Sequence, residues 1–359
     1  MSYNAYRRKS APVKVGGVGI GGEYPISVQS MTNTDTHDVE ATYRQVTSLA
    51  KAGCDIIRIT APDIESADTF RILKERGVKV PLVADIHFNY KIAVAAAQAG
   101  VDKIRINPGN IGSRDKVREV VLACKERGIP IRIGVNSGSL EESILKKYGA
   151  PTPEALAESA LLHASILEDL DFHAILISVK ASNVLAMIAA NRILAQNTNY
   201  PLHLGVTEAG ARIKAVVKSS VGIGALLAEG IGDTVRVSLT DDPIREVELA
   251  REILSSLMLT DRRGMDVVSC PTCGRTKIDL ISIVEDFERR ARIEQIDGKN
   301  IKVAIMGCVV NGPGEAREAD IGVAGGKGEA LLFKKGEIIR KISEKDIVDE
   351  LIKEIKCMN

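Results

Sequence analysis

The sequence lacks several features that would assign it to a broad class. None of its apolar runs reaches eighteen residues, and the basic residues Arg7, Arg8 and Lys9 are not followed by an apolar stretch. Its 48 lysine and arginine residues nearly balance its 47 aspartate and glutamate residues, so the net charge of +1 does not indicate a nucleic-acid-binding surface. We therefore expect a cytoplasmic protein that binds neither membranes nor nucleic acids.

Histidine is also scarce, which limits the kinds of metal site. The chain has five histidines, and none follows His203. Three of its six cysteines lie in two motifs, SCPTCG (269–274) and MGCVVNGPGEA (306–316). Because a cytoplasmic chain keeps its thiols reduced, this group predicts metal or redox chemistry rather than disulfides. A zinc ribbon would need a second CxxC or a Cys/His pair, which these motifs do not supply.

Short β-branched runs alternate with amphipathic helical segments between about residues 25 and 240. Largely apolar strands in this alternation predict parallel pairing with right-handed crossovers. Eight such units favour a TIM (β/α)8 barrel over an open doubly wound sheet. The predicted strands are residues 26–32, 55–60, 81–87, 103–109, 131–137, 174–180, 202–208 and 234–240.

The alternation of strands and helices stops near residues 261–265. The chain is also longer than a single hydrophobic core usually allows. We expect a barrel domain over residues 1–262, with a glycine-rich hairpin at 13–22 that closes its N-terminal end. A small α+β domain over residues 263–359 is expected to follow, with a β-hairpin at 325–342 that turns at KKGE. A bound metal would help to stabilise a domain of this size.

The predicted barrel strands carry an unusual number of cations toward their C-terminal ends. Catalytic groups of a TIM barrel come from these strand ends. Arginines there can pack at the rim against carboxylates, but few carboxylates, chiefly Asp85 and Glu208, accompany them. Buried cations without partners favour an anionic ligand, and guanidinium forks around a lysine suit a diphosphate. We therefore predict a small phosphorylated substrate. The cations are Arg58, Arg105, Arg132, Lys180 and Arg236.

The remaining histidines and cysteines give weaker signals. His87 and His203 end predicted strands, where a hydrogen-bonded structural histidine is more common than a metal ligand. Cys54 and Cys124 lie in the barrel region and are expected to be buried, inert thiols.

The two cysteine motifs supply three thiolate ligands, which is one fewer than a metal site with four protein ligands needs. Iron-sulfur ligation tolerates widely separated cysteines, and zinc held by three cysteines and a carboxylate is the alternative. The fourth ligand could be Glu315, which the bend at NGPG can turn back toward Cys308, or Cys357 near the C-terminus. A carboxylate holds iron less tightly than a thiolate, so Glu315 would suit a catalytic cluster better than an electron relay.

These motifs, taken together, resemble one known family. CPTCGRT and MGCVVNGPGEA, with ADIHFN, KIRINPGN, RIGVNSGSL and LGVTEAG from the barrel, are similar to the 4-hydroxy-3-methylbut-2-enyl diphosphate synthases (IspG, also called GcpE) in their bacterial two-domain form. The resemblance covers about residues 10 to 355. It implies reductive ring opening and dehydroxylation of 2-C-methyl-D-erythritol 2,4-cyclodiphosphate to (E)-4-hydroxy-3-methylbut-2-enyl diphosphate, in the non-mevalonate isoprenoid pathway.

The resemblance also implies a cofactor, partners and residue roles. It implies a 4Fe-4S cluster, reduction by ferredoxin or flavodoxin, and a head-to-tail homodimer in which one subunit's cluster domain closes over the other's barrel. Glu208 and Asn311 match residues near the reacting carbons. The implied cluster ligands are Cys270, Cys273, Cys308 and Glu315. The implied substrate-binding residues are Arg58, Arg105, Arg132, Asn136, Lys180, Thr207, Arg236 and Ser238.

Two other functions fit parts of the sequence. A pterin-type barrel transferase with a structural zinc domain would share the phosphate-binding mouth. A non-catalytic iron-sulfur electron carrier would share the cysteine motifs. Iron and sulfide content distinguishes the zinc-containing transferase from the main prediction. Reduction of the cyclodiphosphate distinguishes the electron carrier from it.

Overall fold

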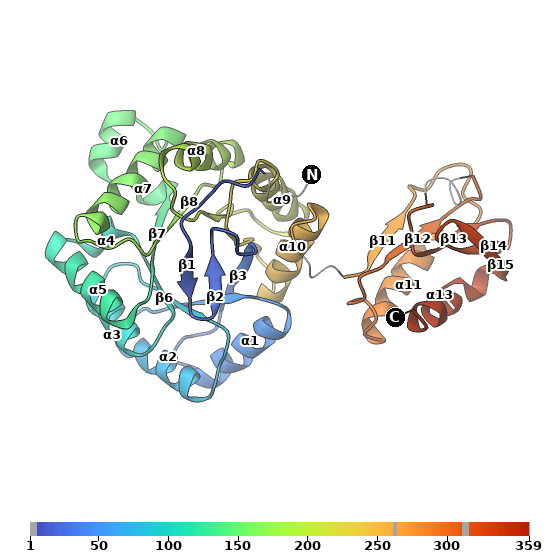
Figure 1. Cartoon of the computed structure of the whole chain (residues 1–359), viewed down its shortest axis with the longest axis horizontal. Helices are drawn as coiled ribbons and strands as arrows, with labels where there is room; N and C mark the ends of the chain where they lie inside the picture. Colours follow the sequence, from blue (N-terminus) through green and yellow to red (C-terminus); the bar gives the residue numbers. More distant parts are fainter. Residues whose placement is uncertain (1–5, 261–263, 311–315, 359) are drawn as a thin grey trace. The chain divides into compact units, whose positions relative to one another are not determined.

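The computed structural model describes residues 6–260, 264–310 and 316–358. The chain divides into two compact units, Met1–Thr260 and Asp261–Asn359 (Figure 1). Each unit has its own hydrophobic core.

Eight parallel strands form the barrel of the first unit, in the order β8-β7-β6-β5-β4-β3-β10-β9. A bridge between Ile177 and Leu202 joins β8 to the residue before β9 and closes the barrel. The predicted TIM barrel is therefore confirmed. The strands are β3 (Ser27–Met31), β4 (Ile56–Thr60), β5 (Leu82–Asp85), β6 (Lys103–Ile106), β7 (Ile131–Asn136), β8 (Ile175–Lys180), β9 (His203–Leu204) and β10 (Thr234–Val235).

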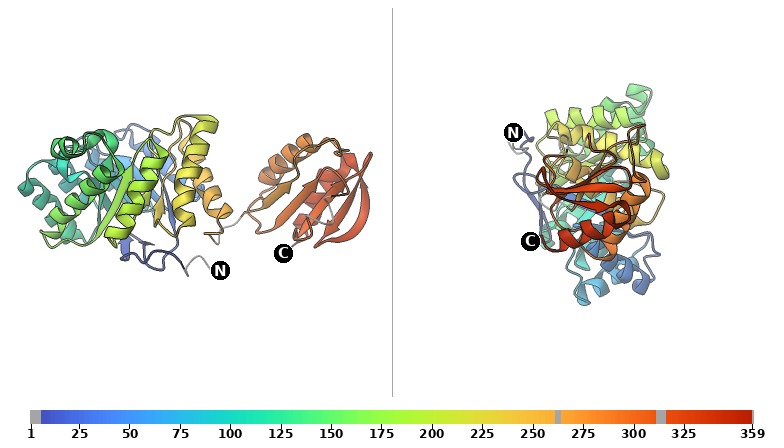
Figure 2. Two further views of the ribbon diagram at one scale, coloured as in Figure 1. Left: turned by 90° about the horizontal axis from the view of Figure 1, so that it is seen from above. Right: turned by 90° about the vertical axis from the view of Figure 1, so that its right-hand side faces the viewer.

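Helices surround this barrel and lie side by side around it (Figures 1 and 2). Their apolar faces pack on the outward residues of the strands in one continuous core. The long helices are α1 (Val39–Lys51), α2 (Ser66–Glu75), α3 (Tyr90–Gln98), α5 (Arg114–Arg127), α7 (Pro153–Glu168), α8 (Val184–Asn197), α9 (Arg212–Ala228) and α10 (Pro243–Ser256). Three short helical segments, α4 (Pro108–Ile111), η2 (Ser137–Ser139) and α6 (Glu142–Tyr148), follow β6 and β7.

The last two barrel strands are much shorter than predicted. Residues 202–208 and 234–240 were expected to be strands, but the ladders cover only two residues each. Beyond them the backbone still makes hydrogen bonds, from Thr207 N to Ala181 O (3.3 Å) and from Arg236 N to Leu204 O (2.9 Å). A glycine, Gly205, follows β9 directly, and glycine weakens a strand at the point where the ladder stops.

A two-stranded hairpin lies across one end of the barrel. β1 (Val13–Val15) and β2 (Val18–Ile20) pair antiparallel, as the glycine-rich segment predicted. Val13, Val15 and Ile20 pack against residues near the N-terminal ends of barrel strands, so the hairpin covers the end opposite the predicted site.

The second unit is a five-stranded mixed sheet with two helices. Its strands are β11 (Asp266–Ser269), β12 (Lys302–Met306), β13 (Ile321–Gly325), β14 (Glu329–Lys334) and β15 (Glu337–Ser343). The first three are parallel, and β13, β14 and β15 pair antiparallel in turn. Helices α11 (Leu280–Ile293) and α13 (Ile347–Lys356), the latter preceded by η3 (Glu344–Asp346), pack on one face of the sheet (Figure 1).

The predicted hairpin in this unit is present. β14 and β15 turn at Lys335 and Gly336, both with positive φ, as a two-residue turn with right-handed strand twist requires.

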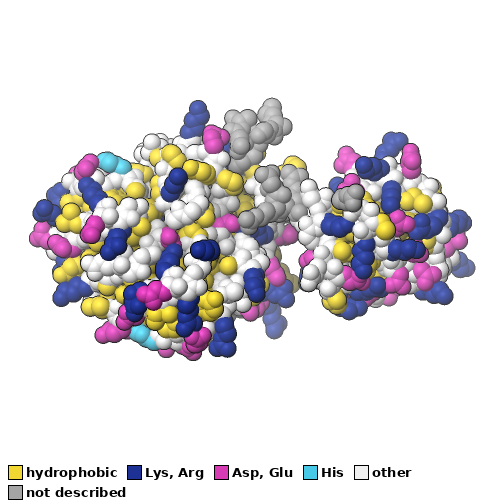
Figure 3. All heavy atoms as spheres, turned by 60° about the horizontal axis from the view of Figure 1, so that its bottom comes forward, with side chains coloured by type: hydrophobic (Ala, Val, Ile, Leu, Met, Phe, Trp, Pro, Cys, Tyr) yellow, Lys and Arg dark blue, Asp and Glu magenta, His cyan; other side chains and the backbone are white. Residues whose placement is uncertain are grey.

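The surface shows no extended region of one charge on the face drawn in Figure 3, where basic and acidic side chains are interspersed. Every helix in the described ranges is too short or too polar to cross a lipid bilayer.

Candidate functional site

The centre of the barrel site is a buried carboxylate between two guanidinium groups. Asp85, the last residue of β5, is 3% exposed. Arg105 Nη1 lies 3.1 Å from Asp85 Oδ1, and Arg58 Nε lies 3.6 Å from Oδ2. Burial alone would raise the pKa of Asp85, but Arg58 and Arg105 outweigh it and hold the pKa well below its usual range. The carboxylate therefore fixes both arginines in place.

A second, deeper layer contains two more cations, and no carboxylate of the described residues contacts either of them. Arg132 on β7 is 1% exposed, and its Nη1 donates to Gln29 Oε1 at 3.1 Å. The same oxygen lies 3.5 Å from the Nζ of Lys103, which is fully buried at the start of β6. Burial, and then the charges of Arg132 and Arg58, lower the pKa of Lys103 well below its ordinary value. A neutral amide is thus the partner of both cations.

Lys180 and Arg236 complete the set of cations. Lys180, at the end of β8, is buried, and its Nζ makes no hydrogen bond to any described residue. Burial and then the charges of Arg236, Arg58 and Arg132 lower its pKa well below the ordinary value. Arg236 Nη2 lies 3.2 Å from Glu246 on α10, whose other oxygen accepts from Ser30.

The structure therefore brings all five predicted cations together. Four guanidinium groups face two carboxylates, Asp85 and Glu246, which leaves two positive charges before either lysine is counted (4 − 2 = 2). Arginine does not lose its proton in proteins, so this excess persists at any physiological pH. Such a site favours an anion with at least two negative charges.

His203 lies in the same interior and is not available as a charged group. It is fully buried, with Nδ1 3.4 Å from Thr234 Oγ1, and its Nε2 has no hydrogen-bond partner in the described part of the chain. Burial, followed by the charges of Arg132 and Lys180, lowers its pKa well below the usual value, so the imidazole is neutral.

The other barrel residues predicted from the sequence lie at the same strand ends. Asn136 ends β7 and is paired in register with Lys180, while Ser238 lies two residues after Arg236. Thr207 is half-buried, and Glu208 is exposed with φ of 51°. A left-handed backbone conformation is uncommon for glutamate.

Several interior residues escaped the sequence analysis: Gln29, Lys103 and the carboxylate of Glu246. Lys103 could have been found, because it lies two residues before Arg105 on one strand and the two must face the same way. Glu246 lies on a helix, and nothing in its local sequence indicates that it reaches Arg236.

The two cysteine motifs meet at one edge of the second sheet. Cys270 follows β11 and Cys308 follows β12, and these neighbouring strands are parallel, with Ser269 in register with Ile305. Gly307 N donates to Cys270 Sγ at 3.3 Å, and Lys277 N donates to Gly307 O at 2.9 Å. The CxxC loop is thus held against the residue before Cys308.

The three cysteines of the two motifs differ in exposure. Cys308 is buried, Cys270 is half-buried and Cys273 is exposed. A hydrogen bond from the backbone of Arg275 lowers the pKa of the Cys273 thiol. Within residues 6–260, 264–310 and 316–358, no three His, Cys, Asp or Glu side chains are arranged as a metal site. Asn311 and Glu315 lie outside the described residues.

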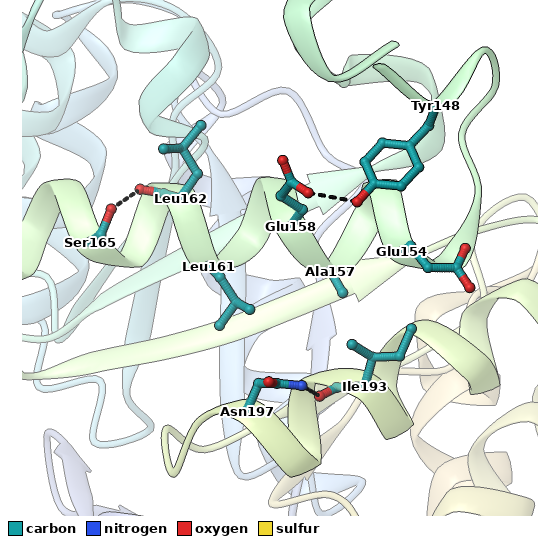
Figure 4. Close-up of a pocket in the computed structure, with 9 residues that line it drawn as sticks. All are labelled: Tyr148, Glu154, Ala157, Glu158, Leu161, Leu162, Ser165, Ile193 and Asn197. Carbon is teal, nitrogen blue, oxygen red and sulfur yellow. Dashed lines mark hydrogen bonds between the residues drawn. The ribbon is translucent and has the colours of Figure 1, made fainter. Parts of the chain in front are cut away.

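A separate groove lies on the outer surface of the barrel (Figure 4). Tyr148, Glu158, Leu162 and Asn197 are among its lining residues, and they come from α6, α7 and α8. None of the barrel cations lines it, so it is not part of the site described above.

Comparison with known proteins places the chain in a family. The GcpE TIM-barrel domain matches residues 10–251, and the GcpE protein C-terminal domain matches residues 266–357. The chain belongs to the GcpE family. Both units match, so the family assignment covers the cationic barrel and the cysteine motifs alike.

Two curated relatives of this GcpE-family chain carry the same name. The protein from Clostridium perfringens is 59% identical over 352 residues, covering 98% of this chain and 99% of its own length. That from Bacillus licheniformis is 56% identical, covering 99% of this chain and 95% of its own length. Both are named 4-hydroxy-3-methylbut-2-en-1-yl diphosphate synthase (flavodoxin).

Solved structures support the barrel fold and nothing more specific. Dihydropteroate synthase from Stenotrophomonas maltophilia superposes with a TM-score of 0.51 at 14% identity, covering 70% of this chain and all of that chain. At that identity the likeness concerns the fold alone. The family match to both units does not support the alternative prediction of a pterin-type transferase with a zinc domain.

Proposed function

We propose that this protein makes (E)-4-hydroxy-3-methylbut-2-enyl diphosphate from 2-C-methyl-D-erythritol 2,4-cyclodiphosphate, the step of the non-mevalonate isoprenoid pathway implied by its relatives' name. The reaction consumes two electrons and two protons, opens one ring C–O bond and releases one water. The observation that carries the proposal is the buried excess of two positive charges in the interior of a GcpE-family barrel.

The charge of the barrel matches the substrate. Each phosphate of the cyclic diphosphate carries one ionised oxygen, so the ring brings two negative charges to a site with an excess of two positive charges. Asp85 holds the guanidinium groups of Arg58 and Arg105 in fixed positions. Lys180 Nζ, which has no hydrogen-bond partner among the described residues, supplies a further donor. The same cations stay bound to the diphosphate as the ring opens, so they stabilise the negative charge of the leaving oxygen.

Residues around this cation set would orient the carbon end of the substrate. Asn136, Thr207 and Ser238 are placed at the same strand ends to add hydrogen bonds. Glu208, which is exposed and has a φ of 51°, is our candidate for delivering a proton to the departing hydroxyl group. Asn311 is assigned to the same region on the resemblance alone.

The cysteine motifs fit a 4Fe-4S cluster. Parallel strands deliver Cys270 and Cys308 to one edge, and Cys270 Sγ already accepts a backbone N–H, as cluster sulfurs commonly do. Cys270, Cys273 and Cys308 would hold three irons, with Glu315 as the fourth ligand. A bound cluster would supply single electrons to the substrate, which protein side chains cannot do.

Partners and location follow from the same proposal. The relatives' name points to flavodoxin as electron donor, with ferredoxin as the alternative. We also propose a head-to-tail homodimer, in which the cluster domain of one subunit serves the barrel of the other. Reduced thiols for cluster assembly favour the cytoplasm.

Anaerobic turnover tests this function. Protein reconstituted with iron and sulfide, given the cyclodiphosphate and reduced flavodoxin, should form one product molecule per two electrons. Roughly four irons and four sulfides per chain should accompany a broad absorption near about 400 nm. Brown protein that never reduces the cyclodiphosphate would favour an electron carrier, and colourless protein with one zinc would contradict the cluster.

A further inference from the structure

Two glycines of the barrel lie directly beneath cations of the anion site. A Cβ atom at Gly134, on β7, would lie 2.7 Å from Nη2 and 2.8 Å from Cζ of Arg105, and closer still to Nε. A Cβ at Gly205, after β9, would lie 2.8 Å from Nζ of Lys180. In each case the cation extends from one strand across a glycine of the next strand in the barrel.

The backbone at these positions does not itself require glycine. Neither Gly134 nor Gly205 has a positive φ, so any residue could adopt the same conformation. Glycine also weakens a strand interior. What these positions need is the space that a side chain would fill.

At Gly134, that space is used entirely by Arg105. The three atoms nearest to an added Cβ all belong to the Arg105 guanidinium group. The guanidinium lies over the β7 backbone, with Nη2 3.4 Å from Gly134 O and Nη1 3.1 Å from Asp85 Oδ1. The Asp85 carboxylate therefore holds the guanidinium group, and the absence of a side chain at Gly134 leaves the space in which it lies.

We propose that Gly134 is a positioning residue of the diphosphate site: its lack of a side chain lets Arg105 lie across β7 and point its fork at the substrate. Gly205 serves Lys180 in the same way. This inference rests on the proposed function, since it concerns how the same anion is held.

The effect of filling the space should fall on binding rather than on folding. The group that must move in Gly134→Ala is the end of a flexible side chain, so the strand itself can stay where it is. Gly205 is a poorer test position, because a Cβ there would also lie 2.5 Å from the backbone oxygen of Arg236. The experiment therefore uses Gly134.

Calorimetric binding of the cyclodiphosphate to the full-length protein, without reductant, tests the proposal. Gly134→Ala should weaken binding by about tenfold or more, since the loss of one hydrogen bond between charged groups costs roughly ten- to a hundredfold. Its melting temperature should stay within about two degrees of wild type. Gly224→Ala, on α9 with open space around it, is the matched control and should bind as wild type does.

A double variant separates positioning from a general disturbance. Lysine in place of Arg105 has no fork to collide with a methyl group, so Gly134→Ala should cost less than about threefold in the Arg105→Lys background. Equal affinity of wild type and Gly134→Ala would overturn the proposal, as would the same loss in both backgrounds. Failure of the wild type to bind would instead overturn the proposed function.

Discussion

The barrel and the cysteine edge hold their polar residues in different ways. In the barrel, Asp85, Gln29 and Glu246 contact five cations, so side chains of the barrel itself hold the positively charged interior. At the cysteine edge, two parallel strands bring Cys270 and Cys308 together, but the described side chains do not form a metal site. Contacts among described residues thus hold the barrel cations, whereas we propose that a bound cluster completes the cysteine site.

The largest expected effect comes from replacing a cysteine of the cysteine edge, because it is a proposed ligand of the cluster and is not part of the barrel site. Cys308→Ser should abolish turnover and most of the iron, because serine is a poor ligand for iron in such a cluster. Affinity for the cyclodiphosphate, measured by calorimetry, should change by less than about threefold. Cys357→Ser, on an exposed cysteine near the C-terminus, is the control and should keep both activity and iron.

Replacing the predicted fourth ligand should separate cluster assembly from chemistry. Glu315→Ala should abolish turnover while most of the cluster iron remains, because three thiolates still hold the cluster. Iron analysis and the turnover assay measure the two effects on one sample. Full activity in this variant would show that Glu315 is not the ligand that gives way to substrate.

Removing one barrel cation should weaken substrate binding and leave the iron content unchanged, which is the reverse of the effect expected for Cys308→Ser. Arg132→Met should weaken cyclodiphosphate binding by roughly ten- to a hundredfold, the range for one or two hydrogen bonds to a charged group. Its iron content should match wild type. An Arg132→Met protein that binds normally but loses iron would contradict the separation of the two regions.

Binding should also depend on pH through Lys180. Burial and neighbouring cations lower the pKa of this amine in the free protein, and a bound dianion should raise it. Binding then takes up a proton, so affinity should fall as pH rises through the window between the two pKa values, by up to about tenfold per pH unit. Calorimetry in buffers of different ionisation enthalpy measures the uptake.

The cyclodiphosphate itself has no group that titrates near neutral pH, so the proton must go to the protein. Lys180→Met should abolish the uptake along with much of the affinity. An affinity that stays constant as the pH rises toward the ordinary pKa of a lysine amine would contradict this role.

The smallest effect is on stability. Lys103→Met removes a fully buried amine that contacts no carboxylate in the described part of the chain, so it should raise the free energy of unfolding by about 1–2 kcal/mol. Because the folded pKa of Lys103 lies below its unfolded value, this gain should shrink as pH rises toward the unfolded pKa. Urea titrations at two pH values test it, and a destabilised variant would show that Lys103 supports the fold.

The eight-strand barrel and its five cations could be predicted because β-branched runs and charged residues are local features. The lengths of β9 and β10 could not, since they depend on backbone hydrogen bonds between strands far apart in sequence. The inward position of Lys103 could have been predicted, because it lies two residues before Arg105 on β6. Gly134 was not, because its role appears only once Arg105 is seen to lie across the next strand.

Calorimetry on iron-free protein tests the central claim most directly. The barrel holds its cations without help from the cysteines, so protein stripped of iron should bind the cyclodiphosphate at one site per chain. Its affinity should lie within about threefold of that of the iron-loaded enzyme. Binding that appears only after the cluster is restored would contradict the claim that the fold alone builds the anion site.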